Sequence, residues 1–106
     1  MATSKDYRDY LAEQLSGTDT LLRPMMGEYV LYCGGRVVGG LYDNRLLVKP
    51  TPAARAMLPA APEEAPYAGA KPMLLVQETD DKAFLAALLP AIAAEIPEKP
   101  KKKRET

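Results

Sequence analysis

The first pattern along the chain is that of an amphipathic helix near the N-terminus. Long side chains recur there at helical spacing, at Tyr7, Tyr10, Leu11, Gln14 and Leu15, so that the four apolar ones among these five lie on one face. Thr3 stands before this run as the candidate N-cap, with Asp6 three positions later in the spacing of a capping box. Ser16-Gly17 predicts the end of the helix, because glycine accepts the left-handed conformation of helix C-termini.

Residues 21–49 are predicted to be extended throughout and to form an antiparallel meander. Gly34-Gly35 is a two-residue hairpin signal, and Asp43-Asn44 predicts a second turn because both residue types tolerate the backbone angles of tight turns. These turns separate three β-rich runs, at residues 28–33, 36–42 and 45–49.

Two features modify this meander. Pro24 biases the residue before it to extended geometry and lacks an N–H, so the first extended piece is expected at an edge of the sheet. Gly39-Gly40 lies inside the middle strand, where glycine is costly. We therefore expect a β-bulge or a close approach of another backbone at this pair.

The second half of the chain predicts a short helix, a loop and one more strand. Pro52 fits the first helical position, with Thr51 as the cap. Proline is frequent in residues 59–72, which predicts a surface loop with a short extended piece near Tyr67. Residues 72–77 are mainly apolar and predict a buried strand.

The final element is predicted to be an apolar helix that begins at Asp80 or Thr79 as its cap. Pro90 falls inside it and removes one backbone hydrogen bond, so we expect a kink or two short helices in tandem. The stripe facing the core consists of Phe84, Leu85, Leu88, Leu89, Ile92 and Ile96.

Together these elements predict an α+β fold of the order α-β-β-β-α-β-α. An antiparallel sheet, made of the meander and the later strand, carries helices packed on it. Residues 1–97 are expected to form a single domain, and residues 98–106 a flexible basic tail.

Composition fits this picture. The chain has 106 residues, of which 47% are hydrophobic and 26% charged, ordinary values for one globular domain. No apolar run is long enough to span a bilayer, and the N-terminus does not resemble a secretory signal. A single cysteine, Cys33, excludes an internal disulfide and suits the cytoplasm; we expect its thiol to be partly buried and unreactive.

The net charge of zero conceals an asymmetry. Residues 98–106 carry five basic and two acidic side chains, a net charge of +3, so the remaining residues carry −3. Nucleic-acid affinity comes mostly from phosphate neutralisation, so the acidic part of the chain is a poor candidate for it. The candidate phosphate contacts are in the tail: Lys101, Lys102, Lys103 and Arg104.

The chain lacks the side chains on which most enzymes depend. It has no histidine, so the commonest general base and the commonest transition-metal ligand are missing. The carboxylate pairs Glu63-Glu64 and Asp80-Asp81 lie in a proline-rich loop and at a helix start, where structural roles suffice. We predict no catalytic residues, no metal and no cofactor.

Residues 23–49 resemble the N-terminal domain of the TfoX/Sxy family, bacterial regulators of competence for DNA uptake. The family reads approximately R-P-M-F-G-x-Y-x-L-Y, then a short turn and a strand ending in L-Y-x-K. This chain has RPMMGEYVLY at residues 23–32 and LLVK at 46–49, so that Met26 replaces phenylalanine and Leu47 replaces tyrosine. The matching motif positions are Arg23, Pro24, Met25, Gly27, Tyr29, Tyr32 and Lys49.

The resemblance covers about residues 5–97. It implies a two-layer α/β sandwich like that of type III secretion chaperones, and a regulatory or adaptor role without catalytic residues. The regulators also carry a C-terminal domain, for which these 106 residues leave no room.

Three hypotheses for function remain open. The first is a protein-interaction module with an unknown protein partner, a homodimer being one form of it. The second is a nucleic-acid-associated protein that uses the basic tail, with Arg23 and Arg36 in support. The third is a small-molecule binding domain, which requires a deep apolar pocket. None of them involves a membrane.

Overall fold

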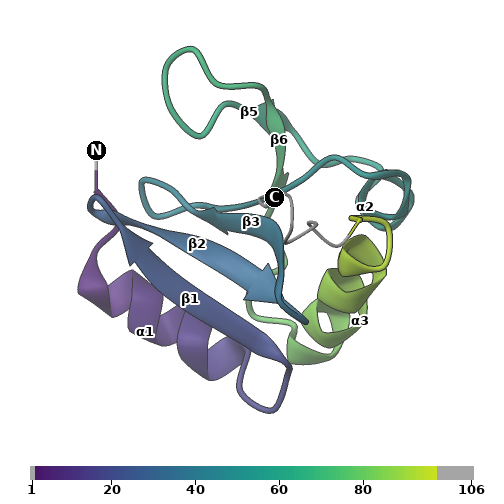
Figure 1. Cartoon of the computed structure of the whole chain (residues 1–106), viewed down its shortest axis with the longest axis horizontal. Helices are drawn as coiled ribbons and strands as arrows, with labels where there is room; N and C mark the ends of the chain where they lie inside the picture. The colour runs from purple at the N-terminus through teal and green to yellow at the C-terminus, as the bar shows by residue number, and fades with distance from the viewer. Residues whose placement is uncertain (1, 98–106) are drawn as a thin grey trace, which may run out of the picture.

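The computed structural model describes residues 2–97, which form an α+β fold of three helices and six strands (Figure 1). All six strands belong to one antiparallel sheet with the order β1-β2-β3-β4-β6-β5. The predicted fold class is confirmed. In chain order the elements are α1 (Lys5–Gln14), β1 (Thr20–Met25), β2 (Glu28–Cys33), β3 (Arg36–Leu41), β4 (Leu46–Val48), α2 (Pro52–Met57), β5 (Glu63–Glu64), β6 (Met73–Val76) and α3 (Lys82–Ala93).

Two strands extend the predicted order to α-β-β-β-β-α-β-β-α. The piece around Pro24 is a complete strand, β1, and lies at an edge of the sheet as expected. The short extended piece in the proline-rich loop is β5, and it lies at Glu63–Glu64 rather than near Tyr67. It pairs with β6 and forms the opposite edge of the sheet.

Two-residue turns connect the first four strands. The two predicted turns are confirmed, because both residues of Gly34-Gly35 and both of Asp43-Asn44 have positive φ. A third turn of this kind, Met26-Gly27, joins β1 to β2 with φ of 51° at Met26 and 88° at Gly27. The sequence patterns did not mark it, because methionine is not a residue that favours positive φ.

The expected bulge is present in the middle of the meander. Leu31 of β2 pairs with Gly39 of β3, whereas the next residue, Tyr32, pairs with Val37. Val38 is therefore an extra residue in β3, and it packs into the core.

Both glycines that follow Val38 are also sites of close approach. A Cβ on Gly39 would lie 2.1 Å from the carbonyl oxygen of Leu47 in the adjacent strand. A Cβ on Gly40 would lie 2.7 Å from the ring of Tyr42. Because Gly39 has no side chain, β3 and β4 can pair closely. Because Gly40 has none, the Tyr42 ring can pack directly against the backbone of the sheet.

The helices pack on one face of the sheet. Alternate strand residues and the apolar faces of the helices form one buried cluster, which includes Leu11, Leu31, Leu46, Leu74 and Leu88. In Figure 1, α1 runs beneath β1 and β2, while α2 and α3 stand together beyond the ends of these strands. The intervening strand residues point to the other face, which none of the described helices covers. We call it the open face.

Two predicted helix caps are one residue off. Ser4, not Thr3, caps α1, because the Thr3 hydroxyl donates instead to the Glu28 carboxylate at 2.7 Å. Asp81, rather than Asp80 or Thr79, caps α3 by accepting from the backbone N–H of Phe84.

The other helix predictions hold with one correction. Thr51 caps α2, and Pro52 follows it in the first turn as predicted. Of the predicted stripe, Leu85, Leu88, Leu89 and Ile92 are buried, Phe84 is partly buried, and Ile96 lies beyond the end of α3. One helix runs through Pro90, and the chain does not form two. Pro90 and Ala86, whose carbonyl loses its N–H partner, are both exposed, so water can replace the missing bond.

Two further observations concern targeting and the tail. No helix within residues 2–97 has both the length and the apolar character that crossing a bilayer requires. The predicted tail lies outside the described residues, as do its candidate phosphate contacts Lys101, Lys102, Lys103 and Arg104.

Candidate binding surface

Three of the four carboxylates in the predicted pairs have structural roles. Glu63 accepts from Arg55 Nη1 at 2.9 Å, and Glu64 accepts from Arg45 Nη1 at 2.6 Å. Asp81 serves as a helix cap. Within residues 2–97, no three His, Cys, Asp or Glu side chains lie close enough to share a metal ion.

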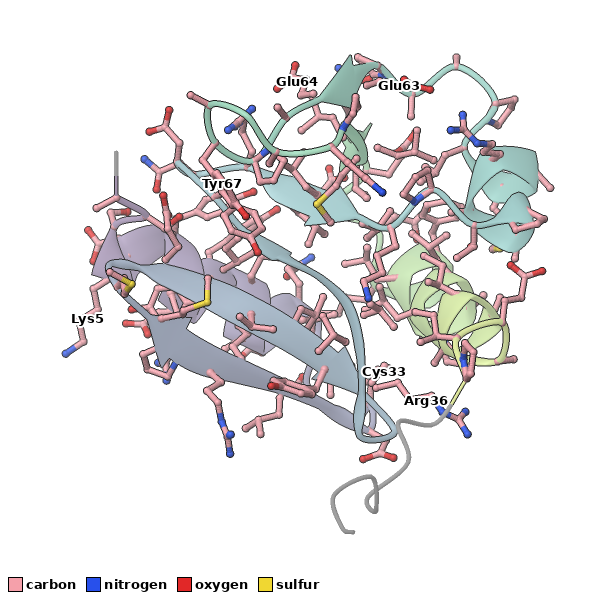
Figure 2. The ribbon with its side chains drawn as sticks, turned by 45° about the horizontal axis from the view of Figure 1, so that its top comes forward. Lys5, Cys33, Arg36, Glu63, Glu64 and Tyr67 are labelled. Carbon is pink, nitrogen blue, oxygen red and sulfur yellow. The ribbon has the colours of Figure 1, made fainter. Side chains whose placement is uncertain are left out.

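The most elaborate feature of the open face is a loop that overhangs it, residues 65–72, which we call the overhanging loop. Figure 2 shows Tyr67 on this loop, with Glu63 and Glu64 on the neighbouring β5. Arg45, which directly precedes β4, fastens the base of the loop. Its Nε donates to the carbonyl of Tyr42 at 3.0 Å, and its Nη2 lies 3.5 Å from the carbonyls of Ala65 and Pro66.

Two tyrosines meet where the loop approaches the sheet. The ring of Tyr42 packs against Gly40, and its centroid lies 6.4 Å from that of the Tyr67 ring at an interplanar angle of 58°. This tilted arrangement is favourable for aromatic pairs. Tyr42 is 9% exposed and Tyr67 is 63% exposed, so the pair has a fixed inner member and an accessible outer one. A hollow lies on either side of it.

The first hollow, which we call the methionine cleft, has a volume of about 660 Å³. It lies between the Met26-Gly27 turn and the overhanging loop, and its walls include Met25, Met26, Tyr42, Pro66 and Tyr67. Met26 is 98% exposed and Met25 is 40% exposed. Of the five large apolar side chains exposed in the described residues, three therefore gather at this cleft. Their clustering makes the methionine cleft the candidate binding surface of the described residues.

Charged groups at the methionine cleft differ in how they are paired. Glu28 Oε1 accepts from the Thr3 hydroxyl and from the backbone N–H of Asp43, so this carboxylate ties the N-terminus to a turn. Arg45 is held by the contacts given above. The exposed carboxylate of Asp43 has no partner among residues 2–97. The cleft therefore offers one free negative charge beside an apolar surface.

The second hollow, which we call the lysine hollow, has a volume of about 580 Å³. Its floor is the open face at β3 and β6, with Lys49 just after β4, and the overhanging loop forms another wall. Apolar lining residues include Val37, Tyr42, Tyr67 and Met73, and the charged ones are Lys49, Arg55, Glu63 and Lys71.

The motif positions that carried the family resemblance do not form one site. Met25 and Gly27 lie at the tip of the first hairpin, and Lys49 lines the lysine hollow. Arg23 and Tyr32 form a cation–π contact of 5.6 Å beside Pro24, and Arg8 lies 5.9 Å from the centroid of the Tyr29 ring. Arg36, named with Arg23 for nucleic acid, donates to the carbonyl of Ala93 at the end of α3.

Sequence reasoning missed the two residues that define both hollows, Tyr42 and Tyr67. Tyr42 falls at the end of the predicted strand at residues 36–42, and Tyr67 marks only the neighbourhood of a predicted extended piece. Gly40 was the signal that could have identified Tyr42. A glycine two positions before an aromatic residue lies on the same face of the strand and leaves room for the ring to pack there.

Burial raises the pKa of two groups, Cys33 in the core and Tyr42 between the two hollows. It raises the pKa of the Cys33 thiol, with the Asp19 carboxylate adding to the rise, which agrees with an unreactive cysteine. Burial also raises the pKa of Tyr42, and the neighbouring Tyr67 and Glu28 contribute in the same direction.

We expect the shift at Tyr42 to appear as a loss of stability in alkali. Above about pH 10, an unfolded chain releases its tyrosine protons at the ordinary pKa, whereas folded Tyr42 retains its proton. The free energy of unfolding should therefore fall as pH rises through that range, and it should fall less steeply in Tyr42→Phe. Urea unfolding at pH 8 to 11 measures both slopes, and identical slopes would contradict the assignment.

Comparison with known proteins gives one informative match. No model of a protein family matches the chain, and no solved structure matches it. Among curated proteins, the chain is similar to the "Uncharacterized 12.7 kDa protein in trpE 5'region" of Spirochaeta aurantia. The two are 36% identical over 109 residues, which cover 100% of this chain and 94% of that protein.

Proposed function

The chain belongs to the same family as the Spirochaeta aurantia 12.7 kDa protein, and we propose that it is a non-enzymatic adaptor or regulatory module of the cytoplasm. In this proposal it binds a partner protein in the methionine cleft. The resemblance to the TfoX N-terminal domain supports such a role, because Met25 of that motif lines the cleft and Gly27 belongs to the turn beside it.

Met26 is the observation that carries the proposal. A left-handed backbone costs a residue other than glycine on the order of 1 kcal/mol, which asparagine or glycine would largely avoid in this type of turn. The side chain contributes no core packing in return, since it is 98% exposed. A residue that weakens the fold and presents an apolar side chain to solvent is typical of a binding surface.

The chemistry of the cleft defines the partner. Methionine side chains are flexible and polarisable and adapt to apolar partners, while the tyrosine pair forms a firmer wall. The free carboxylate of Asp43 lies beside them. We therefore expect a segment of the partner that inserts an apolar side chain and carries a basic residue next to it.

Photo-crosslinking in cells of the host tests where the partner binds. Benzoylphenylalanine replaces Tyr67 in the cleft and, as the control, Tyr10, an exposed aromatic residue on α1. Position 67 should crosslink to one protein that position 10 does not reach. Equal yields at both positions, or crosslinks only to a second copy of this chain, would refute the proposal.

The purified partner then tests Met26. Met26→Asn should weaken binding at least tenfold, because it removes an apolar side chain worth roughly 1.5–3 kcal/mol when buried. The same change should raise the free energy of unfolding by about 1 kcal/mol, because it relieves the turn. Leu21→Thr is the matched control, since Leu21 is exposed on β1 outside the cleft. Calorimetric titration and urea unfolding give the two values, and unchanged affinity in Met26→Asn would contradict the role of the cleft.

A further inference from the structure

We propose that the lysine hollow is a separate site for a small molecule with an apolar body and a carboxylate head group. This inference does not rest on the proposed function, because the two hollows lie on opposite sides of the Tyr42–Tyr67 pair. It concerns a ligand that enters between the sheet and the overhanging loop.

The size and lining of the hollow fit such a ligand. Its volume of about 580 Å³ is within the range of roughly 300–1,000 Å³ typical of small-molecule pockets. Val37 and Met73 reach it from β3 and β6, and both are only partly buried by the protein itself. Tyr42 and Tyr67 add aromatic surface. An apolar ligand would cover side chains that otherwise remain in water.

Charge determines the head group. Arg55 and Glu63 pair with each other at 2.9 Å and largely cancel. Lys49 and Lys71 also line the hollow, and neither has an acidic partner among residues 2–97. The hollow therefore carries two uncompensated positive charges next to a mainly apolar surface. An anionic head group would pair with the lysines, and an alkyl or aromatic body would pack against the apolar side chains of the walls.

A carboxylate fits better than a polyphosphate. Polyphosphates are held by several cations and by backbone N–H groups of glycine-rich loops or helix starts. Here the lysines face aromatic and aliphatic side chains on a sheet, and most of the lining would lie against the body of the ligand. A single negative charge matches that proportion of apolar to charged surface.

The test compares three ligands that share an alkyl chain and differ in the head group: octanoate, octanol and octyltrimethylammonium. Titrations are followed by amide shifts of the ¹⁵N-labelled protein. Octanoate should bind saturably, about ten times more tightly than octanol, and octyltrimethylammonium should bind most weakly. The shifts should concentrate at Val37, Lys49, Tyr67 and Met73.

Variants assign the effect to the two lysines. Lys49→Met combined with Lys71→Met should reduce octanoate affinity about tenfold, to that of octanol. Lys5→Met is the control, because Figure 2 shows Lys5 at the start of α1, pointing away from the overhanging loop. Circular dichroism and thermal unfolding of each variant establish that the fold is intact, which is expected because neither substituted lysine is buried.

Several results would overturn the inference: equal affinity for octanoate and octanol, an equal loss in Lys5→Met, or shifts confined to the methionine cleft. Met26→Asn should leave octanoate binding unchanged. The two proposals can therefore fail separately. The lysine substitutions and amide shifts test the ligand site, whereas Met26→Asn and calorimetric titration test partner binding.

Discussion

Replacing Gly39 by alanine is expected to lower the free energy of unfolding by at least about 3 kcal/mol or to prevent folding altogether. The added Cβ would lie 2.1 Å from the carbonyl oxygen of Leu47 and 2.8 Å from the Cα of Val48. Both are backbone atoms of β4, so no side-chain rotation can relieve the contact. The sheet would have to open between β3 and β4, which pair directly at Gly39, the site of the clash.

Gly17→Ala provides the matched control for this experiment. Gly17 has a φ of 85° and no atom within 4 Å of an added Cβ. Gly17→Ala should therefore lower the free energy of unfolding by only about 1–2 kcal/mol, because alanine is disfavoured in the left-handed conformation. Soluble yield and urea unfolding by circular dichroism measure both variants. If Gly39→Ala were no more destabilising than Gly17→Ala, the close approach of β3 and β4 would be wrong.

The predicted parts of the fold are those that local chemistry determines. Gly34-Gly35 and Asp43-Asn44 were recognised as turns because these residue types accept positive φ. Met26-Gly27 adopts the same geometry with a residue that does not, so the first hairpin was predicted only as an extended piece at an edge. A local rule cannot identify a turn whose first residue, Met26, is unfavourable for the turn.

Tertiary contacts account for the displaced caps. Thr3 and Ser4 are both suitable N-caps, and the choice between them depends on Glu28, which lies far along the chain and engages the Thr3 hydroxyl. At α3, Asp80 and Asp81 are equally suitable by residue type, and the structure selects the second. Sequence patterns locate such helix ends to within a residue and cannot resolve them further.

The candidate site could not be predicted because it is assembled by a loop. The hydrophobic pattern located the strands that form the floor of both hollows, and proline content identified the loop. Nothing in either pattern indicates that residues 65–72 fold back over the open face. That arrangement depends on Arg45, whose contacts reach across the sheet to Glu64 and to two loop carbonyls.

Replacing Arg45 by methionine is the second change with a large expected effect. Methionine keeps much of the aliphatic volume but removes every hydrogen bond to the base of the loop. The Glu64 carboxylate, which is 35% exposed, would lose its partner, and the carbonyl of Tyr42 would keep only the backbone N–H of residue 45. We expect a loss of roughly 1.5–3 kcal/mol in the free energy of unfolding, since hydrogen bonds to charged groups contribute about that much. Both hollows should lose their ligands, because the overhanging loop forms a wall of each.

Arg55→Met separates this anchoring role from the general effect of removing an ion pair. Arg55 pairs with Glu63, the neighbour of Glu64 on β5, but that pair is about half exposed, at 54% and 48%. Exposed pairs contribute between about 0 and 1 kcal/mol, so Arg55→Met should be nearly neutral. Chymotrypsin provides a direct readout, because Tyr67 is exposed on the loop. Cleavage after Tyr67 should accelerate about tenfold in Arg45→Met and stay unchanged in Arg55→Met, since only the first change frees the loop to enter the protease. Equal cleavage rates in the two variants would mean that the loop holds its position without Arg45.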